Sequence, residues 1–366
     1  DRVKKARLPG KIVVAAPKGQ RDKPLEKIAK SAGAGFFQGS GENVLKRFID
    51  CAEENGFGTI VRVCADSPLV SPLFLDKAVK QHVKSGNDYT DAFSTLPFGM
   101  GCEVVSLSAL KRVLKATKRK RHLEHVTLYI KENRKLFKAG CLKTAKNFSL
   151  PGVNLTIDYE HDLIKIKNML AALNKQVQSV SVKDVFNFFT LKPGKPLVSI
   201  IIVTRNYGRF IEKSLASVLN QTMPKNQFDV VVVDDGSTDN TPRILKKYGK
   251  MLRVFRKKAE GSIIASNFAF KRARGKFVTK LDADDWFEPE ALEKMFKALE
   301  KNKKAAFAYC DIRHLIGKKQ RTVSLRKFGL FKTIACGILF RKKEIIELNG
   351  AKKMYNEKLF FPEYDL

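Results

Sequence analysis

Residues 198–207 read VSIIIVTRNY, an apolar and largely β-branched run that passes abruptly into polar residues. A continuous apolar run of this length is typical of a strand that is buried on both faces of a parallel sheet. Three further apolar runs, separated by helical patterns, follow at residues 229–233, 252–255 and 276–281. This alternation predicts an α/β domain built on a largely parallel sheet.

The N-terminal half of the chain shows the same kind of alternation. Its apolar runs at residues 12–15, 59–64 and 101–105 are each followed by a helical pattern. The two halves are not a sequence repeat, so we expect two different α/β modules.

A stretch rich in Pro, Gly and Lys separates the two halves. It reads LKPGKP at residues 191–196 and breaks both periodicities, which favours a linker. We therefore expect a first domain at 1–185, a linker at 186–196 and a second domain at 197–366. The length of 366 residues fits two domains of roughly 100 to 200 residues each.

The composition is that of a packed and strongly basic protein. Seventy Lys and Arg against 37 Asp and Glu give a formal charge of +33, which attracts phosphates, anionic lipid or nucleic acid without specificity. The lysines are not interleaved with aromatics as in a base-stacking platform, so a dedicated nucleic-acid function is disfavoured. No run reaches the roughly 18 to 20 apolar residues of a membrane span. The six cysteines form no Cys-x-x-Cys pair, which favours a cytoplasmic setting, with peripheral contact at the inner face of a membrane as an option.

Two of the expected strands of the second half end in acidic residues. Residues 229–233 lead into Asp234-Asp235-Gly236-Ser237, where glycine permits a tight turn and the carboxylates can accept from a base N–H. Ligands of open α/β sheets bind beyond such strand ends. A plain turn that caps the next helix is the alternative.

The second acidic strand end reads Asp282-Ala283-Asp284-Asp285. Three carboxylates within four residues repel one another unless a cation or hydrogen-bond donors hold them. A hard divalent ion, Mg or Mn, would do so and would also bridge the two phosphates of a nucleotide sugar. Taken alone, the motif is equally compatible with a solvated acidic turn.

The order of these motifs closely resembles that of family 2 glycosyltransferases, which have the GT-A fold. The resemblance implies a metal-dependent, inverting transfer of a sugar from a UDP- or GDP-linked donor to a glycan or lipid-linked acceptor. The implied nucleotide-sugar site consists of Thr204, Asn206, Asp234, Asp235, Asn267 and Asp282. The implied metal ligands are Asp282 and Asp284.

Inverting transfer requires one carboxylate to take the proton from the attacking acceptor hydroxyl. The final residues, FFPEYDL at 360–366, resemble the acidic motif that carries this base in the family. Glu363 falls on the base position and Asp365 is the alternative. A simple acidic helix start is the other interpretation.

In the N-terminal half, Asp66 and Asp158 each follow an apolar run and could converge on one metal ion, although each taken alone is more typical of a helix cap or turn. His122 and His125 have the spacing of a zinc pair, but no third ligand is evident, so a surface or satisfied histidine is favoured.

Segments 62–69, 101–104, 124–127 and 155–163 together resemble sugar-activating cytidylyltransferases, of the CMP-sialic acid synthetase, CMP-KDO synthetase and spore coat polysaccharide type. The resemblance implies CTP and a sugar as substrates and a second Rossmann-like nucleotide-binding domain. Asp66 and Asp158 would then be metal ligands. The implied substrate side is lined by Glu103, Glu124 and His125.

That family opens with a strand and a triphosphate-binding loop. Here RLPGK at residues 7–11 matches the end of such a loop but is followed at once by the run at 12–15. We expect a first domain truncated at its N-terminus and a second truncated at its C-terminus. The leading hypothesis is a bifunctional protein of surface polysaccharide or glycoprotein glycan biosynthesis. The alternative is a catalytically silent basic scaffold that binds anionic glycan, a membrane surface or nucleic acid.

Overall fold

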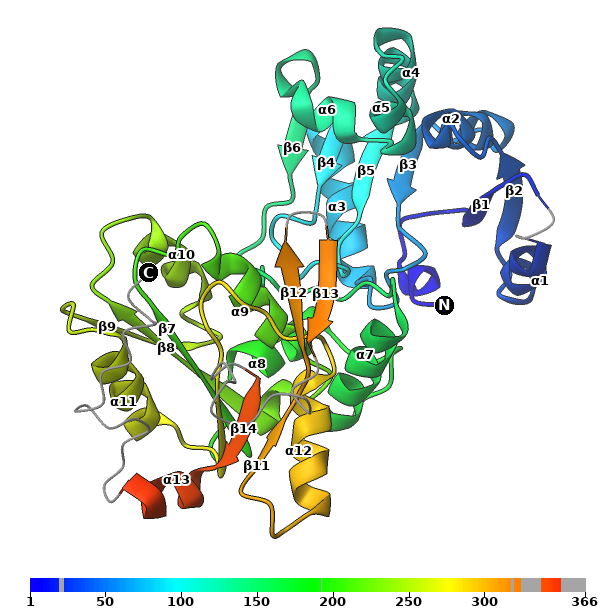
Figure 1. The fold of residues 1–366 in the computed structure, drawn as a ribbon. Helices are drawn as coiled ribbons and strands as arrows, with labels where there is room; N and C mark the ends of the chain where they lie inside the picture. The colour runs from blue at the N-terminus through cyan, green and yellow to red at the C-terminus, as the bar shows by residue number, and fades with distance from the viewer. Residues whose placement is uncertain (20–22, 192, 317–318, 324–336, 350–366) are drawn as a thin grey trace. The chain divides into compact units, whose positions relative to one another are not determined.

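The computed structural model describes residues 1–19, 23–191, 193–316, 319–323 and 337–349. The chain divides into two compact units (Figure 1). Unit 1 consists of Asp1–Ser149, Leu155–Ile157 and Val177–Lys183, and unit 2 consists of Leu150–Asn154, Asp158–Gln176 and Asp184–Leu366. No helix in the described ranges is long and apolar enough to cross a bilayer.

Unit 1 contains two sheets. The parallel pair is formed by β1 (Val13–Pro17) and β2 (Gly35–Gly39). The other sheet has the order β3 (Thr59–Arg62), β5 (Glu103–Ser106), β4 (Tyr89–Asp91) and β6 (Ala139–Cys141). Because β5 runs antiparallel to β3 and to β4, this sheet is mixed, whereas the sequence predicted a largely parallel one. The expected α/β class is confirmed.

The helices of unit 1 follow the amphipathic patterns of the sequence. They are η1 (Val3–Lys5), α1 (Lys23–Ser31), α2 (Val44–Glu54), α3 (Pro72–Ser85), α4 (Leu107–Ala116), α5 (Lys120–Glu124), α6 (Leu128–Glu132) and η3 (Arg134–Leu136). The Asn43 side chain caps α2 and the Ser106 side chain caps α4, each accepting from a first-turn amide. Leu45 and Ile49 of α2 pack with Leu110 of α4 in the core of the unit.

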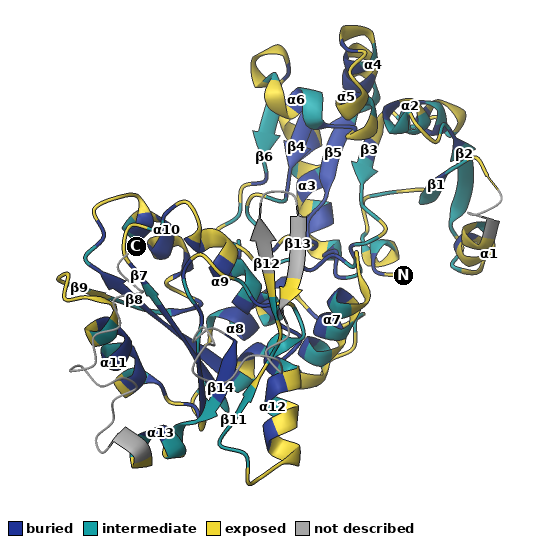
Figure 2. Cartoon of the chain, in the orientation of Figure 1, coloured by how far each residue is buried: buried dark blue, intermediate teal, exposed yellow. Residues whose placement is uncertain are grey.

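Unit 2 is organised around one large sheet. Its strands are β7 (Val198–Thr204), β8 (Phe228–Asp235), β9 (Arg253–Lys257), β10 (Phe277–Lys280), β11 (Phe307–Tyr309) and β14 (Ile338–Arg341), in the order β11-β14-β10-β7-β8-β9. The four strands β10, β7, β8 and β9 are parallel, and β14 is antiparallel to both of its neighbours. Almost every residue of β7 and β8 is buried, as the continuous apolar runs predict (Figure 2).

Helices cover this sheet, and a hairpin extends from it. The remaining elements are α7 (Glu160–Ala172), α8 (Val182–Thr190), α9 (Ile211–Leu219), η4 (Lys225–Gln227), α10 (Thr241–Tyr248), α11 (Ser262–Arg272), α12 (Ala291–Lys301), α13 (Lys342–Asn349) and the hairpin of β12 (Ile312–Ile316) with β13 (Lys319–Val323). Apolar residues of α11, such as Ala265 and Phe270, pack on Ile201 of β7 and Val231 of β8. This packing holds α11 against the middle of the two strands.

Two helices do not follow the expected domain boundaries. Helix α7 packs in unit 2, where Lys165 Nζ lies 3.1 Å from Asn220 Oδ1 and Asn168 Nδ2 donates to the carbonyl of Thr222 at 2.9 Å. Helix α8 continues to Thr190 because Phe186, Phe188 and Phe189 are buried, so residues 186–190, expected in the linker, are helical. The boundaries at 185 and 197 stay a prediction.

Candidate functional site

The first two parallel strands end side by side in unit 2. Thr204, the last residue of β7, is the register partner of Asp234 in β8, so their side chains emerge on the same face of the sheet. Both residues are buried, with 2% and 1% of their surface exposed. Within the described part of the chain, Thr204 Oγ1 and Asp234 Oδ2 have no hydrogen-bond partner. Buried polar atoms without a partner are rare in folded proteins, and a bound ligand is one of their ordinary explanations.

Asp234 is otherwise held firmly in place. Its Oδ1 atom accepts from the amide of Ser237 at 2.9 Å. Arg256 Nε lies 3.5 Å from Oδ2, which counts as an ion pair but is too loose for a good hydrogen bond. Because the Arg256 side chain is 60% exposed, water screens this pair. One carboxylate oxygen therefore faces the strand ends with little compensation.

Asn206 ties the loop after β7 to the turn after β8. It adopts a left-handed backbone conformation with φ of 59°, which asparagine tolerates better than most residues. Its amide donates to Ser237 Oγ at 2.9 Å, and its Oδ1 accepts from the amide of Thr238 at 2.8 Å. The Asn206 side chain therefore holds the loop after β7 against the turn after β8.

Asp235 likewise holds backbone amides in place. Its two carboxylate oxygens accept from the amides of Glu260 at 3.0 Å and Gly261 at 2.9 Å, directly before α11. Gly236 follows with φ of 80°, and a Cβ there would lie 2.8 Å from the Ala259 amide nitrogen. Asn267, also predicted for the site, is buried on α11, which begins directly after Gly261.

The Asp-x-Asp segment begins two residues beyond the end of β10. Asp282 Oδ1 lies 2.7 Å from Lys280 Nζ, and its carbonyl accepts from the amide of Asp285 at 3.1 Å. Asp284 is exposed. Burial raises the pKa of the Tyr207 hydroxyl, and the negative charges of Asp284 and Asp282 raise it further, so these carboxylates lie near the loop after β7.

The carboxylates of Asp282 and Asp284 suit a metal ion whose coordination is completed by a bound ligand. In the ranges described, no group of three or more His, Cys, Asp or Glu side chains is arranged to hold a metal. Mg²⁺ typically binds through one or two carboxylates, several waters and the phosphates of a substrate. Asp282 and Asp284 provide such carboxylates. Glu363 and Asp365, the predicted catalytic bases, lie outside the described residues.

A cavity of about 830 Å³ adjoins the Asp-x-Asp segment on the side of α12 and β11. Its lining includes Asp284, Asp285, Trp286, Tyr309 and His161. Lys213 Nζ lies 3.0 Å from the centre of the Trp286 ring, on its face, so a cation–π contact covers one side of the indole. This cavity was not predicted from the sequence. The one available signal was that the chain's single tryptophan lies two residues beyond the Asp-x-Asp motif.

In unit 1, Glu103 is at the centre of a closed network. Its carboxylate is fully buried and lies 2.6 Å from Arg62 Nη1, 2.6 Å from Lys131 Nζ and 2.7 Å from the Tyr89 hydroxyl. Thr127 Oγ1 also donates to it at 2.8 Å. Burial opposes ionisation of Glu103, but Lys131 and Arg62 outweigh it and lower the pKa. The structure therefore surrounds Glu103 with protein donors.

The other predicted residues of the N-terminal site are more dispersed. Asp66 accepts from Ser67 Oγ at 3.0 Å, and its carbonyl accepts from the amide of Ile157 at 2.8 Å. Asp158 belongs to unit 2, where its amide donates to Asp162 Oδ2 at 3.2 Å. A joint metal site of the two aspartates remains a prediction.

The histidines of this half differ in their surroundings. His122 is buried between Thr117 Oγ1 at 2.9 Å and Glu132 Oε2 at 2.8 Å, which fits the satisfied histidine favoured by the sequence. Glu124 and His125 are exposed at the end of α5.

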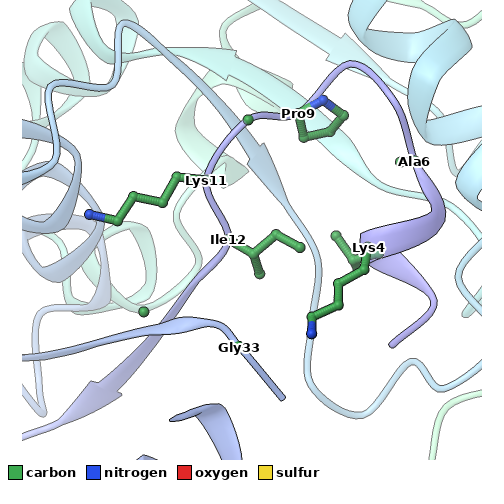
Figure 3. A pocket seen from close by; sticks show the side chains of 9 residues that line it. Lys4, Ala6, Pro9, Lys11, Ile12 and Gly33 are labelled. Atoms are coloured by element: carbon green, nitrogen blue, oxygen red, sulfur yellow. The ribbon is translucent and has the colours of Figure 1, made fainter. Parts of the chain in front are cut away.

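A smaller cavity of unit 1, about 420 Å³, adjoins the RLPGK segment (Figure 3). It is lined by Lys4, Pro9, Gly10, Lys11 and Gly33, among others. Figure 3 shows the side chains of Lys4 and Lys11 extending in different directions, so they do not converge on one anion.

Two α/β units, one of them with polar residues at the carboxyl ends of its parallel strands, are typical of enzymes that bind nucleotides. Each half of the chain matches a different protein family. Residues 199–359 match the family described as glycosyl transferase family 2, and residues 1–181 match the cytidylyltransferase family. The chain thus belongs to the cytidylyltransferase family in its N-terminal half and to glycosyltransferase family 2 in its C-terminal half.

Similar proteins cover one half or the other. An uncharacterized protein of Methanocaldococcus jannaschii, MJ1063, is 31% identical over 195 residues, which are 53% of this chain and 78% of that protein. The spore coat polysaccharide biosynthesis protein SpsF of Bacillus subtilis is 33% identical over 43% of this chain and 65% of its own length. A chondroitin synthase of Pasteurella multocida is 38% identical over 33% of this chain, but the match spans only 12% of that synthase.

Proposed function

We propose that unit 2 transfers a sugar, with inversion, from a UDP- or GDP-linked donor to a glycan or lipid-linked acceptor. The observation that carries this proposal is that two buried atoms at neighbouring strand ends, Thr204 Oγ1 and Asp234 Oδ2, have no hydrogen-bond partner among the described residues. A hydroxyl donor beside a carboxylate acceptor suits the edge of a nucleobase, which carries a carbonyl or ring nitrogen next to an N–H group.

The diphosphate would lie toward the Asp-x-Asp segment. Asp282 would contact the ribose and, with Asp284, hold Mg or Mn. Such an ion, when bound, offsets the charge that develops on the departing diphosphate. Asp235 and Asn206 would support the site through the backbone amides that they bind.

The cavity beside Trp286 would receive the acceptor sugar. It opens next to Asp284 and Asp285, close to where the diphosphate is expected. The side of the Trp286 ring opposite Lys213 would offer an apolar surface that matches the apolar side of a sugar ring. Glu363 or Asp365 would take the proton from the attacking hydroxyl.

The region that matches the cytidylyltransferase family, residues 1–181, would activate a sugar with CTP. Asp66 and Asp158 would hold the metal, and Glu124 and His125 would line the sugar side. Glu103 would act indirectly, since its contacts hold Arg62 and Lys131 in place. The whole chain would serve the synthesis of surface polysaccharide or of glycoprotein glycans.

A donor screen tests the proposal for unit 2. The full chain would be incubated with a panel of UDP- and GDP-sugars and Mn²⁺, and release of the nucleoside diphosphate would be measured. One donor class is expected to be consumed slowly without acceptor, and Asp284→Asn should abolish its consumption. The same scheme with CTP, reading pyrophosphate, tests unit 1. Anionic-polymer binding without turnover of any nucleotide would favour the scaffold alternative.

A further inference from the structure

Lys280 occupies an unusual place for a basic residue beside a metal-binding motif. It is the last residue of β10, and its ammonium nitrogen lies 2.7 Å from Asp282 Oδ1. The two side chains are 12% and 29% exposed, so the pair is partly withdrawn from water. An ion pair in such surroundings is stronger than one on the open surface.

The ammonium group therefore competes with a divalent cation for the same carboxylate. It offsets the charge of Asp282 and would repel an ion placed between Asp282 and Asp284. The described residues also contain no ready-made group of three metal ligands. Both observations argue against tight metal binding by the protein alone.

We propose that Lys280 is a positioning residue that makes metal binding depend on the nucleotide. Before the donor binds, Lys280 holds Asp282 in its working orientation and keeps the affinity for a divalent ion low. The diphosphate brings the negative charge that offsets both Lys280 and the metal, so nucleotide and metal bind together. This inference rests on the function proposed above for Asp282 and Asp284.

The test is Mn²⁺ binding to the full chain, followed by the loss of the electron paramagnetic resonance signal of free Mn²⁺, with and without UDP or GDP. Wild type should bind Mn²⁺ weakly alone and much more tightly with nucleotide. Lys280→Met should bind Mn²⁺ alone roughly tenfold more tightly than wild type, because one positive charge is removed. Adding nucleotide should increase the Mn²⁺ affinity of Lys280→Met by a smaller factor than that of wild type.

Two variants serve as controls. Lys280→Arg keeps the charge and should behave like wild type, which also guards against misfolding of the methionine variant. Lys271→Met removes an exposed lysine of α11 and should leave Mn²⁺ binding unchanged.

The outcomes separate this inference from the function on which it rests. Equal Mn²⁺ affinity of wild type and Lys280→Met, with nucleotide-dependent binding that Asp284→Asn removes, would overturn the role of Lys280 alone. Failure of every protein to bind Mn²⁺ even with nucleotide would overturn both.

Discussion

A substitution at Thr204 can show whether its hydroxyl binds the nucleotide or stabilises the fold. Its buried hydroxyl has no hydrogen-bond partner in the described structure, so replacing it with a methyl group removes an unsatisfied polar atom. Thr204→Val should leave the protein as stable as wild type or slightly more so. It should also weaken nucleotide binding by roughly tenfold through the lost hydrogen bond.

Thermal unfolding and calorimetric titration would measure the two effects. Thr279→Val is a matched control, because Thr279 Oγ1 is also buried and unpartnered but lies within β10. Wild-type nucleotide affinity in Thr204→Val would contradict the assignment of this atom to the site.

Lys225 gives a prediction about pH. It is 3% exposed, and burial lowers its pKa from 10.5 to about 8, a shift that Asp229 partly opposes. The folded protein holds this proton less tightly than the unfolded chain. The destabilisation is therefore complete below pH 8 and disappears as the pH rises through 10.5.

Lys225→Met should accordingly be more stable than wild type at pH 7, by about 1 to 3 kcal/mol, and should lose this advantage near pH 10.5. Urea unfolding at both pH values measures it. Lys250→Met, at an exposed position, should show no such difference. An advantage of Lys225→Met that does not change with pH would show that charge burial is not its cause.

The sequence indicated that the polar residues after the apolar runs lie near one another, because the carboxyl ends of parallel strands meet at one edge of a sheet. Thr204 and Asp234 are indeed register partners. The ion pair of Lys280 with Asp282 could not be predicted, since side-chain directions at a strand end depend on the turn that follows. The enclosure of Glu103 depends on Arg62 and Lys131, which come from distant parts of the sequence.

Among the secondary-structure elements, β7 and β10 are held together by a close backbone approach at Gly275. A Cβ at Gly275 would lie 2.5 Å from the amide nitrogen of Ser199, whose Oγ accepts from the Gly275 amide at 2.8 Å. Gly275→Ala should destabilise the protein by about 1 to 3 kcal/mol, as overpacking of a filled core does.

Chemical denaturation would measure the loss. Gly249→Ala is the matched control, because its nearest neighbour, the Lys246 carbonyl oxygen, is 3.6 Å away and the position has helical φ. The control should be neutral or slightly stabilising. Equal stability of Gly275→Ala and wild type would contradict the close packing described here.

The parallel strands of unit 2 were predictable, whereas the pairing of β14 and the antiparallel direction of β5 were not. Residues 198–203, 229–233 and 276–281 were expected as strands from their apolar runs, and β7, β8 and β10 lie there. Strand β14 pairs between β10 and β11, and β5 runs against its neighbours. Such pairings are set by contacts distant in sequence, which local periodicity does not encode.

The molecule as a whole joins a region of the cytidylyltransferase family and a region of glycosyltransferase family 2 on one strongly basic chain. The formal charge of +33 predicts binding to anionic polymers that weakens steeply with salt. Asp282→Ala/Asp284→Ala should leave this binding intact, because it removes only two of the 37 acidic residues. Heparin affinity chromatography in increasing salt would measure it. Earlier elution of the variant than of wild type would contradict this view.

We propose above that unit 2 holds a metal-dependent nucleotide-sugar site. Calorimetric titration of UDP, GDP and CDP, with and without Mn²⁺, into wild type and Asp282→Ala/Asp284→Ala is the first measurement to make. UDP or GDP should bind wild type only with Mn²⁺, and the double variant should bind neither. Binding that is independent of the metal and of both aspartates, or no binding of any nucleotide, would contradict this proposal.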